Sequence, residues 1–584
     1  MKNYISQTDT QYIRHILGRM PSDDELNVIA KLQTQFLKGR LYIETLNRLD
    51  DGIKRTRIPE EDLTDENGKH IYFYSSLYSN ENAIEDTESL LEVESRTRSA
   101  ISLSKRFGND GLSVKTGLVK TNHPTEIHLA PEGSPFAFLE VPFNKVSKKA
   151  RKSIATLLGK PWVLGTRIVD QYNLPQSLTN WCIQENIGIT INQDIFKSKS
   201  TGFIVVIRNG YEEELIQETS TWKESCTLLG MMSDKPEIKL TDMGGTEITL
   251  PIDVLRFPWR VFTQTRFHRE ELKIDKTLPV DIDSKIDELF WKIWAVEGTH
   301  DEESNISIEQ SDNESKQWVI TSSDNHTSFQ DHPRLAGQLA IADASRNLTC
   351  TGAKPLGLLY RNVFPDSINP EEAWHGFEII QGQEEAIRSL KLPVLKRSIV
   401  SLDEQNIQSI FAVGQRTQAG ADTFSGFQNV GDFISILGSH RGELGYSTYA
   451  KLLHDTINGH LPACDLNMES RMQEAVVQGI QAKLIKSAKP LSRGGLAISI
   501  GKALKTGANG LGARVHFSRK LRTDQMLFGE TQGLILISLG EEDIMEFERI
   551  CMSIGIPSTT IGRVTDTGRY TFNEFFDIAV DELK

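Results

Sequence analysis

The clearest set of chemically capable side chains lies in residues 333–356, which read PRLAGQLAIADASRNLTCTGAKPL. Asp343, Arg346 and Asn347 fall at helical spacing, so the carboxylate shares one helix edge with the guanidinium or the amide. One interpretation is that this edge presents the three groups to a nucleotide or its metal ion. The alternative is an i,i+3 salt bridge on a solvated helix face, and the spacing alone favours neither.

Two more segments carry residues suited to phosphate or metal binding. Gly494 and Gly495 open an expected helix in LSRGGLAISIGKAL, and backbone N–H groups at such a start can meet a phosphate. Tight strand–helix turns use paired glycines for purely steric reasons as well. Glu530 stands just before the apolar run LILIS, where its carboxylate is a candidate metal ligand or a turn residue facing solvent.

Local sequence patterns predict the helices that carry these residues or pack beside them. Ser22 and Glu25 fit a capping box, in which each side chain accepts a hydrogen bond from the other residue's backbone N–H. The apolar face expected after it consists of Leu26, Ile29, Leu32 and Phe36. The helix expected from Pro333 to a cap at Gly352 is dense in alanine and glycine, so it can approach another backbone or a ligand closely.

Residues 199–230 and 530–562 indicate an internal duplication. Each segment has a polar tetrapeptide ending in glycine, a five-residue apolar run, an acidic helix start and a later glycine. The glycines are 230 − 202 = 28 and 562 − 533 = 29 residues apart. Each copy predicts a strand–helix–strand unit within an α/β or α+β module.

Composition narrows the class of protein. The 584 residues suit about four domains, and 38% hydrophobic with 25% charged residues is ordinary for a folded soluble chain. The net charge of 65 − 79 = −14 argues against a general nucleic-acid binder, whereas backbone amides can still bind a small anion. No apolar run approaches the roughly 18 residues of a membrane span.

The termini and the cysteines predict a cytoplasmic protein. The start, MKNYISQTDTQYIRH, lacks a basic cluster followed by an apolar stretch, so we expect no signal peptide. Five cysteines lie far apart without metal spacing, and we expect them to be reduced and buried. They are Cys182, Cys226, Cys350, Cys464 and Cys551.

Taken together, segments of the second half resemble formylglycinamide ribonucleotide amidotransferase (phosphoribosylformylglycinamidine synthase), synthetase subunit, in the superfamily of aminoimidazole ribonucleotide synthetase. They occur in the family's order across about residues 318–572, and they are AIADASRNLTCTGAKPLG, AWHGFEIIQGQEEAIRSLKLPV, ILGSHRGELGYSTYAKLLH, LPACDLNMES, SRGGLAISIGKAL, LFGETQGLIL and IPSTTIGRVTDTGRY. In the first half, ILGRMPSDDEL resembles the family's opening helix and LPIDVL the stretch that closes that half. VKTNHPTEIHLAPEGS resembles its nucleotide motif and keeps Asn122 and His123.

The resemblance implies an α/β and α+β fold, a tandem pseudo-twofold repeat of a two-domain unit with an abridged first copy. The sheet domains are expected to pair into a shared barrel-like sheet. The expected organisation is an N-terminal helical segment (1–50), a first sheet domain (51–150), a first α+β domain (151–265), a linker region (266–330), a second sheet domain (331–425) and a second α+β domain (426–584).

The resemblance also implies a chemistry. In the family, ATP phosphorylates the amide oxygen of formylglycinamide ribonucleotide, and ammonia from a separate glutaminase displaces the phosphate, with magnesium on the triphosphate. The residues assigned to nucleotide binding are Asn122, His123, Arg346, Asn347, Gly494 and Gly495, and those assigned to Mg²⁺ are Asp343 and Glu530. The implied partners are a glutaminase subunit and a small bridging subunit, because no glutaminase signature surrounds a cysteine of this chain.

The chain departs from the family where motifs carry charge or transfer protons. Residues 33–40, QTQFLKGR, lack the family's catalytic histidine, and Val119 replaces a glutamate ahead of the nucleotide motif. RSIV at 397–400 replaces a Gly-Asn-Val-Ser turn, Arg493 replaces an aspartate, and Lys489 begins the pair that replaces His-Asp. These two cations either receive an anion or are solvated.

Two hypotheses follow, and no catalytic residue is assigned under either. One is an active synthetase of this class in de novo purine biosynthesis. The other is a non-catalytic paralogue that keeps the scaffold and at most one structural nucleotide site.

Overall fold

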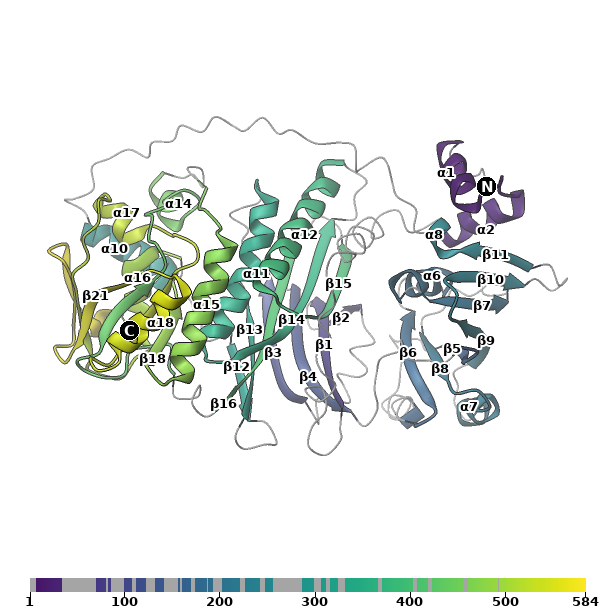
Figure 1. Cartoon of the computed structure of the whole chain (residues 1–584), viewed down its shortest axis with the longest axis horizontal. Helices are drawn as coiled ribbons and strands as arrows, with labels where there is room; N and C mark the ends of the chain where they lie inside the picture. The colour runs from purple at the N-terminus through teal and green to yellow at the C-terminus, as the bar shows by residue number, and fades with distance from the viewer. Residues whose placement is uncertain are drawn as a thin grey trace.

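The computed structural model describes residues 7–33, 70–79, 82–85, 99–107, 112–121, 132–140, 156–157, 160–169, 174–185, 187–192, 202–220, 226–241, 247–255, 286–298, 306–310, 316–323, 331–365, 370–402, 407–417, 423–454, 461–491 and 493–583. Two seven-stranded sheets with their helices form α+β units at opposite ends of the molecule (Figure 1). Two smaller sheets lie between them (Figure 1).

The two α+β units have the same topology. The first sheet contains β5 (Pro135–Glu140), β6 (Val163–Val169), β7 (Gly188–Asn192), β8 (Gly202–Ile207), β9 (Cys226–Ser233), β10 (Glu237–Thr241) and β11 (Glu247–Pro251). The other contains β17 (Phe433–Leu437), β18 (Ile485–Pro490), β19 (Gly512–Val515), β20 (Ile535–Leu539), β21 (Ser558–Thr565), β22 (Arg569–Phe572) and β23 (Phe576–Ala579). Their spatial orders are β6-β8-β5-β9-β7-β10-β11 and β18-β20-β17-β21-β19-β22-β23, so strands correspond one to one in chain order. All pairs are antiparallel except β7/β10 and β19/β22.

The predicted duplication is confirmed down to residue register. The repeated units are β8, α7 (Glu212–Ser220) and β9 in the first copy, and β20, α18 (Ile544–Ile554) and β21 in the second. Gly230 and Gly562 are equivalent, because each pairs with the residue of β5 or β17 that directly precedes a register shift, and in both copies the extra residue of the bulge lies in the glycine's own strand, β9 or β21. An added Cβ would lie 1.8 Å from the Thr190 oxygen or 2.4 Å from the Arg514 oxygen, so both glycines permit close strand contact.

One detail of the expected repeat is wrong. The pairing of β5 with β8 and of β17 with β20 makes Phe203 equivalent to Ile535. Gly202 is therefore equivalent to Leu534, one position beyond Gly533. Only the second glycine of each copy occupies the same place in the fold.

The first α+β unit is abridged. Only 22 residues separate β5 from β6, against 47 between β17 and β18. The longer connection carries α14 (Thr448–His454) and α15 (Leu466–Gln481), and α17 (Thr523–Phe528) lies between β19 and β20. Besides α7 and α18, the two units share a helix between their second and third strands in chain order, which is α6 (Leu174–Glu185) in the first unit and α16 (Gly495–Lys505) in the other.

The two central sheets together form a barrel-like layer. The first has the order β2-β1-β4-β3, from β1 (His70–Ser79), β2 (Asn82–Glu85), β3 (Ser99–Phe107) and β4 (Leu112–Thr121). The second has the order β12-β13-β16-β14-β15, from β12 (Ile306–Gln310), β13 (Lys316–Ser322), β14 (Lys354–Pro365), β15 (Val394–Leu402) and β16 (Ile407–Thr417). Edge strand β3 lies beside edge strand β12, while β1 lies beside β15 at the other side.

Two helices cover the second central sheet, α11 (Pro333–Cys350) and α12 (Pro370–Leu390) (Figure 1). They cross through glycines: a Cβ on Gly337 would lie 2.2 Å from the Ile379 oxygen, and one on Gly382 would lie 1.9 Å from the Arg334 oxygen. The small residues of α11 therefore serve close packing against another backbone, which is one of the two uses expected from the sequence.

The expected domain boundaries shift in three places. Residues 266–330 are not wholly a linker, because β12 and β13 belong to the second central sheet and α10 (Ile286–Ile293) packs in the core of the last unit. A π-helical turn, Trp294–Gly298, continues α10. β5 belongs to the first α+β unit rather than to the sheet domain assigned to 51–150. Helices α1 (Gln7–Leu17), α2 (Asp23–Gln33) and α8 (Ile252–Leu255) also contribute to that unit's core.

The predicted capping box of α2 is confirmed. The Ser22 N–H donates to Glu25 Oε2 at 2.7 Å, and the Glu25 N–H donates to Ser22 Oγ at 3.1 Å. Ile29 and Leu32 are buried and Leu26 packs against them, as the periodicity predicted, whereas Phe36 lies outside the described residues.

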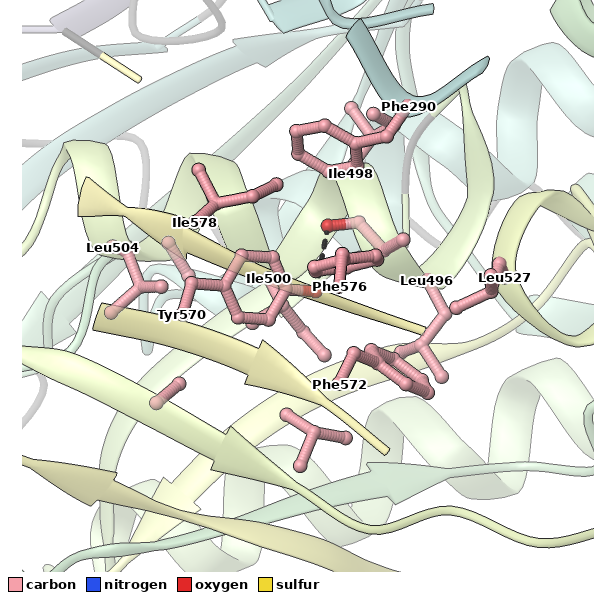
Figure 2. Packing of buried hydrophobic residues seen from close by; sticks show 14 of the residues in the cluster. Phe290, Leu496, Ile498, Ile500, Leu504, Leu527, Tyr570, Phe572, Phe576 and Ile578 are labelled. Carbon is pink, nitrogen blue, oxygen red and sulfur yellow. Dashed lines mark hydrogen bonds between the residues drawn. The ribbon is translucent and has the colours of Figure 1, made fainter. Parts of the chain in front are cut away.

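Helix α16 lies at the centre of the last unit. Leu496, Ile498, Ile500 and Leu504 are all buried among side chains of β22, β23 and α10 (Figure 2). The Tyr570 hydroxyl donates to the Ala497 oxygen at 3.0 Å (Figure 2). A 3₁₀ turn, Val580–Leu583, closes the described chain against this core. This packing fixes the position of the Gly494–Gly495 turn.

In the described part of the chain, none of the helices has the length and apolar content needed to cross a bilayer. All five cysteines are free, three of them buried and two partly buried.

Candidate functional site

The predicted side chains of α11 converge on a buried ion-pair network. Arg346 donates to Glu469 of α15 through two parallel hydrogen bonds, Nε to Oε1 at 2.9 Å and Nη2 to Oε2 at 3.0 Å. Asp343 Oδ1 lies 3.5 Å from Arg346 Nη1. The side chains of Arg346 and Glu469 are only 3% and 4% exposed, against 18% for Asp343. The expected i,i+3 pair exists, but it is buried rather than placed on a solvated face.

The network joins the second sheet domain to the last α+β unit. Gln473 Nε2 donates to Glu469 Oε1 at 2.8 Å, and Ser345 Oγ of α11 donates to Gln473 Oε1 at 2.7 Å. Burial lowers the pKa of Arg346, but the Glu469 carboxylate outweighs it and holds the pKa above its ordinary value. Arg346 therefore stays charged, and it donates its hydrogen bonds to a residue of the same chain.

Asn347 also bonds within the protein. Its Nδ2 donates to the backbone oxygen of Ser322, at the end of β13, at 3.0 Å. The amide thus ties α11 to the sheet that it covers.

The Gly494–Gly495 turn requires glycine for steric reasons, and its backbone N–H group binds a carboxylate of the same chain. Both glycines have positive φ, 83° and 76°, and a Cβ on Gly495 would lie 2.6 Å from the Phe528 carbonyl carbon. Glu530 Oε1 accepts hydrogen bonds from the Gly494 N–H at 2.7 Å and from the Thr448 N–H at 2.9 Å. The carboxylate lies where a helix start would hold a bound anion.

A second carboxylate is close to this turn. Thr448 Oγ1 donates to Glu297 Oε1 at 2.6 Å, and Glu297 is buried. Burial and the nearby Glu297 raise the pKa of Glu530, while its two backbone donors and Arg493 oppose the shift. Arg493 is thus near an anion, but that anion belongs to the chain.

A small cavity opens beside Arg346, between α11, the start of α15 and two short stretches at residues 439–441 and 532–533. Its volume of about 30 Å³ is that of one or two water molecules. Its wall includes Arg441, which pairs with Glu443 at 3.1 Å, and Cys464, whose pKa burial raises to about 12. Cys464 is therefore a neutral thiol and no nucleophile at neutral pH.

Asp343 and Glu530 do not fit a shared Mg²⁺ site. Asp343 faces the Arg346 guanidinium, and Oε1 of Glu530 already accepts two backbone hydrogen bonds. In the described ranges, no three His, Cys, Asp or Glu side chains group as metal ligands. Asn122 and His123 lie outside the described residues.

The sequence reasoning missed the partners of these residues. Glu469 and Gln473 are one helical turn apart in α15. Glu469 lies in the segment LPACDLNMES, and its charge was the one feature of the sequence that could have identified it as a partner of Arg346. His440 is also buried: its Nε2 donates to the Met526 oxygen at 2.9 Å, and its Nδ1 accepts from the Gly442 N–H at 3.2 Å. Burial lowers the pKa of His440, so the neutral ring holds the loop.

Comparison with known proteins agrees with this architecture. The N-terminal domain of AIR synthase related proteins matches residues 304–415, and the C-terminal domain matches residues 429–573. The second half of the chain is therefore similar to AIR synthase related proteins over both of their domains. Both matched domains lie in the second half of the chain.

Among curated proteins, the chain is similar to a PurL subunit. It is 33% identical over 247 residues to the phosphoribosylformylglycinamidine synthase subunit PurL of Symbiobacterium thermophilum, a match covering 41% of this chain and 32% of that protein. The chain thus spans about a third of the length of this curated relative.

Solved structures share the fold across nearly the whole chain. Thermotoga maritima phosphoribosylformylglycinamidine synthase II aligns with a TM-score of 0.56 at 10% identity, over 96% of this chain and all of that one. T. maritima PurL complexed with ATP aligns over the same shares with a TM-score of 0.54 at 11% identity. The PurLQS structure from T. maritima aligns over the same shares with a TM-score of 0.53 at 10% identity.

Proposed function

We propose that this chain is a PurL-like protein of purine biosynthesis in which the second half acts as a scaffold and does not perform the ATP-dependent step. One observation carries the proposal: two hydrogen bonds join the Nε–Nη2 edge of the Arg346 guanidinium to Glu469, and the Arg346 side chain is only 3% exposed. A residue in this geometry stabilises a domain interface and has little capacity left for a triphosphate. Glu530 supports the same reading, because it caps the turn that was expected to meet phosphate.

A second function is favoured by the fold. T. maritima PurL has been solved in complex with ATP and in complex with FGAR, and the present chain aligns with both over 96% of its length. Under this alternative, the chain amidates formylglycinamide ribonucleotide with ATP and Mg²⁺ and uses ammonia from a glutaminase. The solved PurLQS structure from T. maritima supports an assembly of several subunits. The partners and location expected from the sequence resemblance are a glutaminase subunit, a small bridging subunit and the cytoplasm.

The two functions differ in one assay. ATP hydrolysis by the purified chain is measured with ammonium chloride and Mg²⁺, with and without formylglycinamide ribonucleotide. The scaffold function predicts the same background rate in both reactions. A rate that requires both ammonia and the ribonucleotide establishes the synthase and overturns the scaffold proposal.

A further inference from the structure

One face of the sheet in the first α+β unit is covered by α7 along only some of its strands. Helix α7 packs through Leu215 against β5 and β8, whereas β9, β7, β10 and β11 extend beyond it and form an open face. In β9, Leu229 and Met232 belong to the core on the opposite side of the sheet, so Leu228 and Met231 lie on the open face. These two side chains are 40% and 50% exposed.

Ile216 of α7 continues this apolar surface. On one flank of the helix, Glu218 pairs with Lys160, which precedes β6, so that flank faces β6. On the other flank, the Thr219 side chain contacts Cys226, the first residue of β9. Ile216 lies three residues before Thr219, on the flank toward β9, and is 46% exposed. We refer to Ile216, Leu228 and Met231 as the apolar strip.

The equivalent face of the last α+β unit is polar. The pairings of β5 with β9 and of β17 with β21 make Leu228 equivalent to Thr560 and Met231 equivalent to Arg563. Thr560 and Arg563 are exposed, as is Arg514, which pairs with Arg563 from the neighbouring strand β19. Because the same fold forms with polar residues at these positions, strand packing does not require the apolar strip. The strip is therefore available for a contact outside the core of its own unit.

Carboxylates lie on both sides of the apolar strip. Glu213 is exposed and precedes Ile216 by three residues on α7. Glu237 of β10 and Glu247 of β11 lie on the open face, because the residues that follow them belong to the core on the opposite side. Lys239 pairs with Glu237 at 3.3 Å and neutralises that carboxylate alone. In the described part of the chain, negative charge thus borders the strip on both sides.

A surface of this kind fits a partner segment with apolar side chains along its centre and Lys or Arg at its edges. A second copy of the chain fits poorly, because two strips would bring carboxylates together, and the equivalent face of the last unit offers threonine and arginine instead of apolar side chains. We propose that the apolar strip and the carboxylates beside it form a docking site for a basic amphipathic segment of another protein. Burial of the three apolar side chains supplies the attraction, and the carboxylates select a cationic partner.

The test uses the full chain and a model peptide. The probe is an amphipathic helix of Leu and Lys, about 18 residues or five turns long, and a Leu and Glu peptide with the same apolar face is the charge control. Leu228→Thr/Met231→Arg, the strip variant, installs the residues of the last unit at equivalent positions, which this fold accommodates. Glu213→Lys/Glu247→Lys, the rim variant, reverses one charge on each side of the strip.

The matched control is Met545→Thr/Met552→Arg, which changes two methionines of α18 that are 76% and 81% exposed. Affinity is measured by calorimetric titration at low salt, and the bound region by amide hydrogen exchange. We expect the Leu and Lys peptide to bind wild type and the control equally, to protect α7 and β9, and to bind the strip variant and the rim variant at least tenfold more weakly. The Leu and Glu peptide should not bind.

Equal affinity for wild type and the strip variant overturns the proposal, as does an equal loss in the control. A strip variant that fails to fold makes Leu228 and Met231 core residues and overturns it too. Sedimentation of wild type without peptide tests the other occupant: self-association that the strip variant abolishes makes a second copy the partner and contradicts the proposal. None of these readouts depends on ATP hydrolysis, so the docking site and the scaffold function can fail separately.

Discussion

Breaking the Arg346–Glu469 pair should destabilise the contact between the second sheet domain and the last α+β unit far more than a surface ion pair does. Both side chains are almost fully buried and joined by two hydrogen bonds. Replacing either partner leaves the other charge buried without compensation, which typically costs about 3–5 kcal/mol. We therefore expect Arg346→Met and Glu469→Met each to cost about that much.

The double variant Arg346→Met/Glu469→Met supplies the decisive comparison. It removes both charges and restores apolar packing, so it should cost much less than the sum of the single variants. Asp343→Ala is the matched control, because its carboxylate is more exposed and lies 3.5 Å from the guanidinium. We expect a cost of at most ~1 kcal/mol for this control.

Amide hydrogen exchange on peptides from α11 and α15 is the suitable assay, since a chain with several domains need not unfold in a single step. The local opening free energy is compared among wild type, the two single variants, the double variant and the control. Single variants that each cost less than ~1 kcal/mol, or a double variant as unstable as the sum, would refute the view that this pair is a buried structural contact.

Three further predictions concern other contacts. The raised pKa of Glu530 means that the folded state binds this proton more tightly than the unfolded state does. The free energy of unfolding should therefore fall as pH rises from the ordinary carboxyl pKa through the raised one. Glu530→Gln should flatten this part of the plot of melting temperature against pH. The opposite sign holds for Glu25: hydrogen bonding from Arg19 lowers its pKa to about 2, so its contribution is present above 4.5 and lost as pH falls toward 2. Glu25→Gln should remove this acid dependence from the exchange protection of α2. Gly337→Ala should cost about 1–3 kcal/mol or more in thermal unfolding, because the new methyl group meets the Ile379 oxygen, and an unchanged melting temperature would contradict that close crossing.

The repeat was predictable because both copies keep the same local signals. The apolar run before an acidic helix start and the glycine at 230 or 562 are fixed by strand packing, so they remain visible in the sequence. The one-residue error at Gly202 arose because the two glycines have different roles. Gly202 is the first residue of β8 and lies against the Leu139 oxygen, whereas Gly533 has a positive φ in the turn before β20. The linker interpretation of 266–330 failed in part because acidic, polar segments surround short strands, which masked β12 and β13.

Of the candidate site, only the contact between Asp343 and Arg346 on α11 was predictable from the sequence. Helical spacing placed Asp343 and Arg346 together, but their partner Glu469 is 123 residues away, and no local pattern reveals such a contact. The same limit applies to Glu530, whose donors Gly494 and Thr448 come from two other segments.

Under the proposed scaffold function, the charged residues of α11 hold the two domains together and do not bind nucleotide. Calorimetric titration of wild type and Asp343→Ala with Mg-ATP tests it most directly, because Asp343 is the most exposed member of the network and its removal leaves the Arg346–Glu469 bonds in place. The scaffold function predicts the same Mg-ATP affinity for both chains, or the same lack of heat. A loss of tenfold or more in the affinity of Asp343→Ala, with an unchanged melting temperature in the absence of nucleotide, would contradict it.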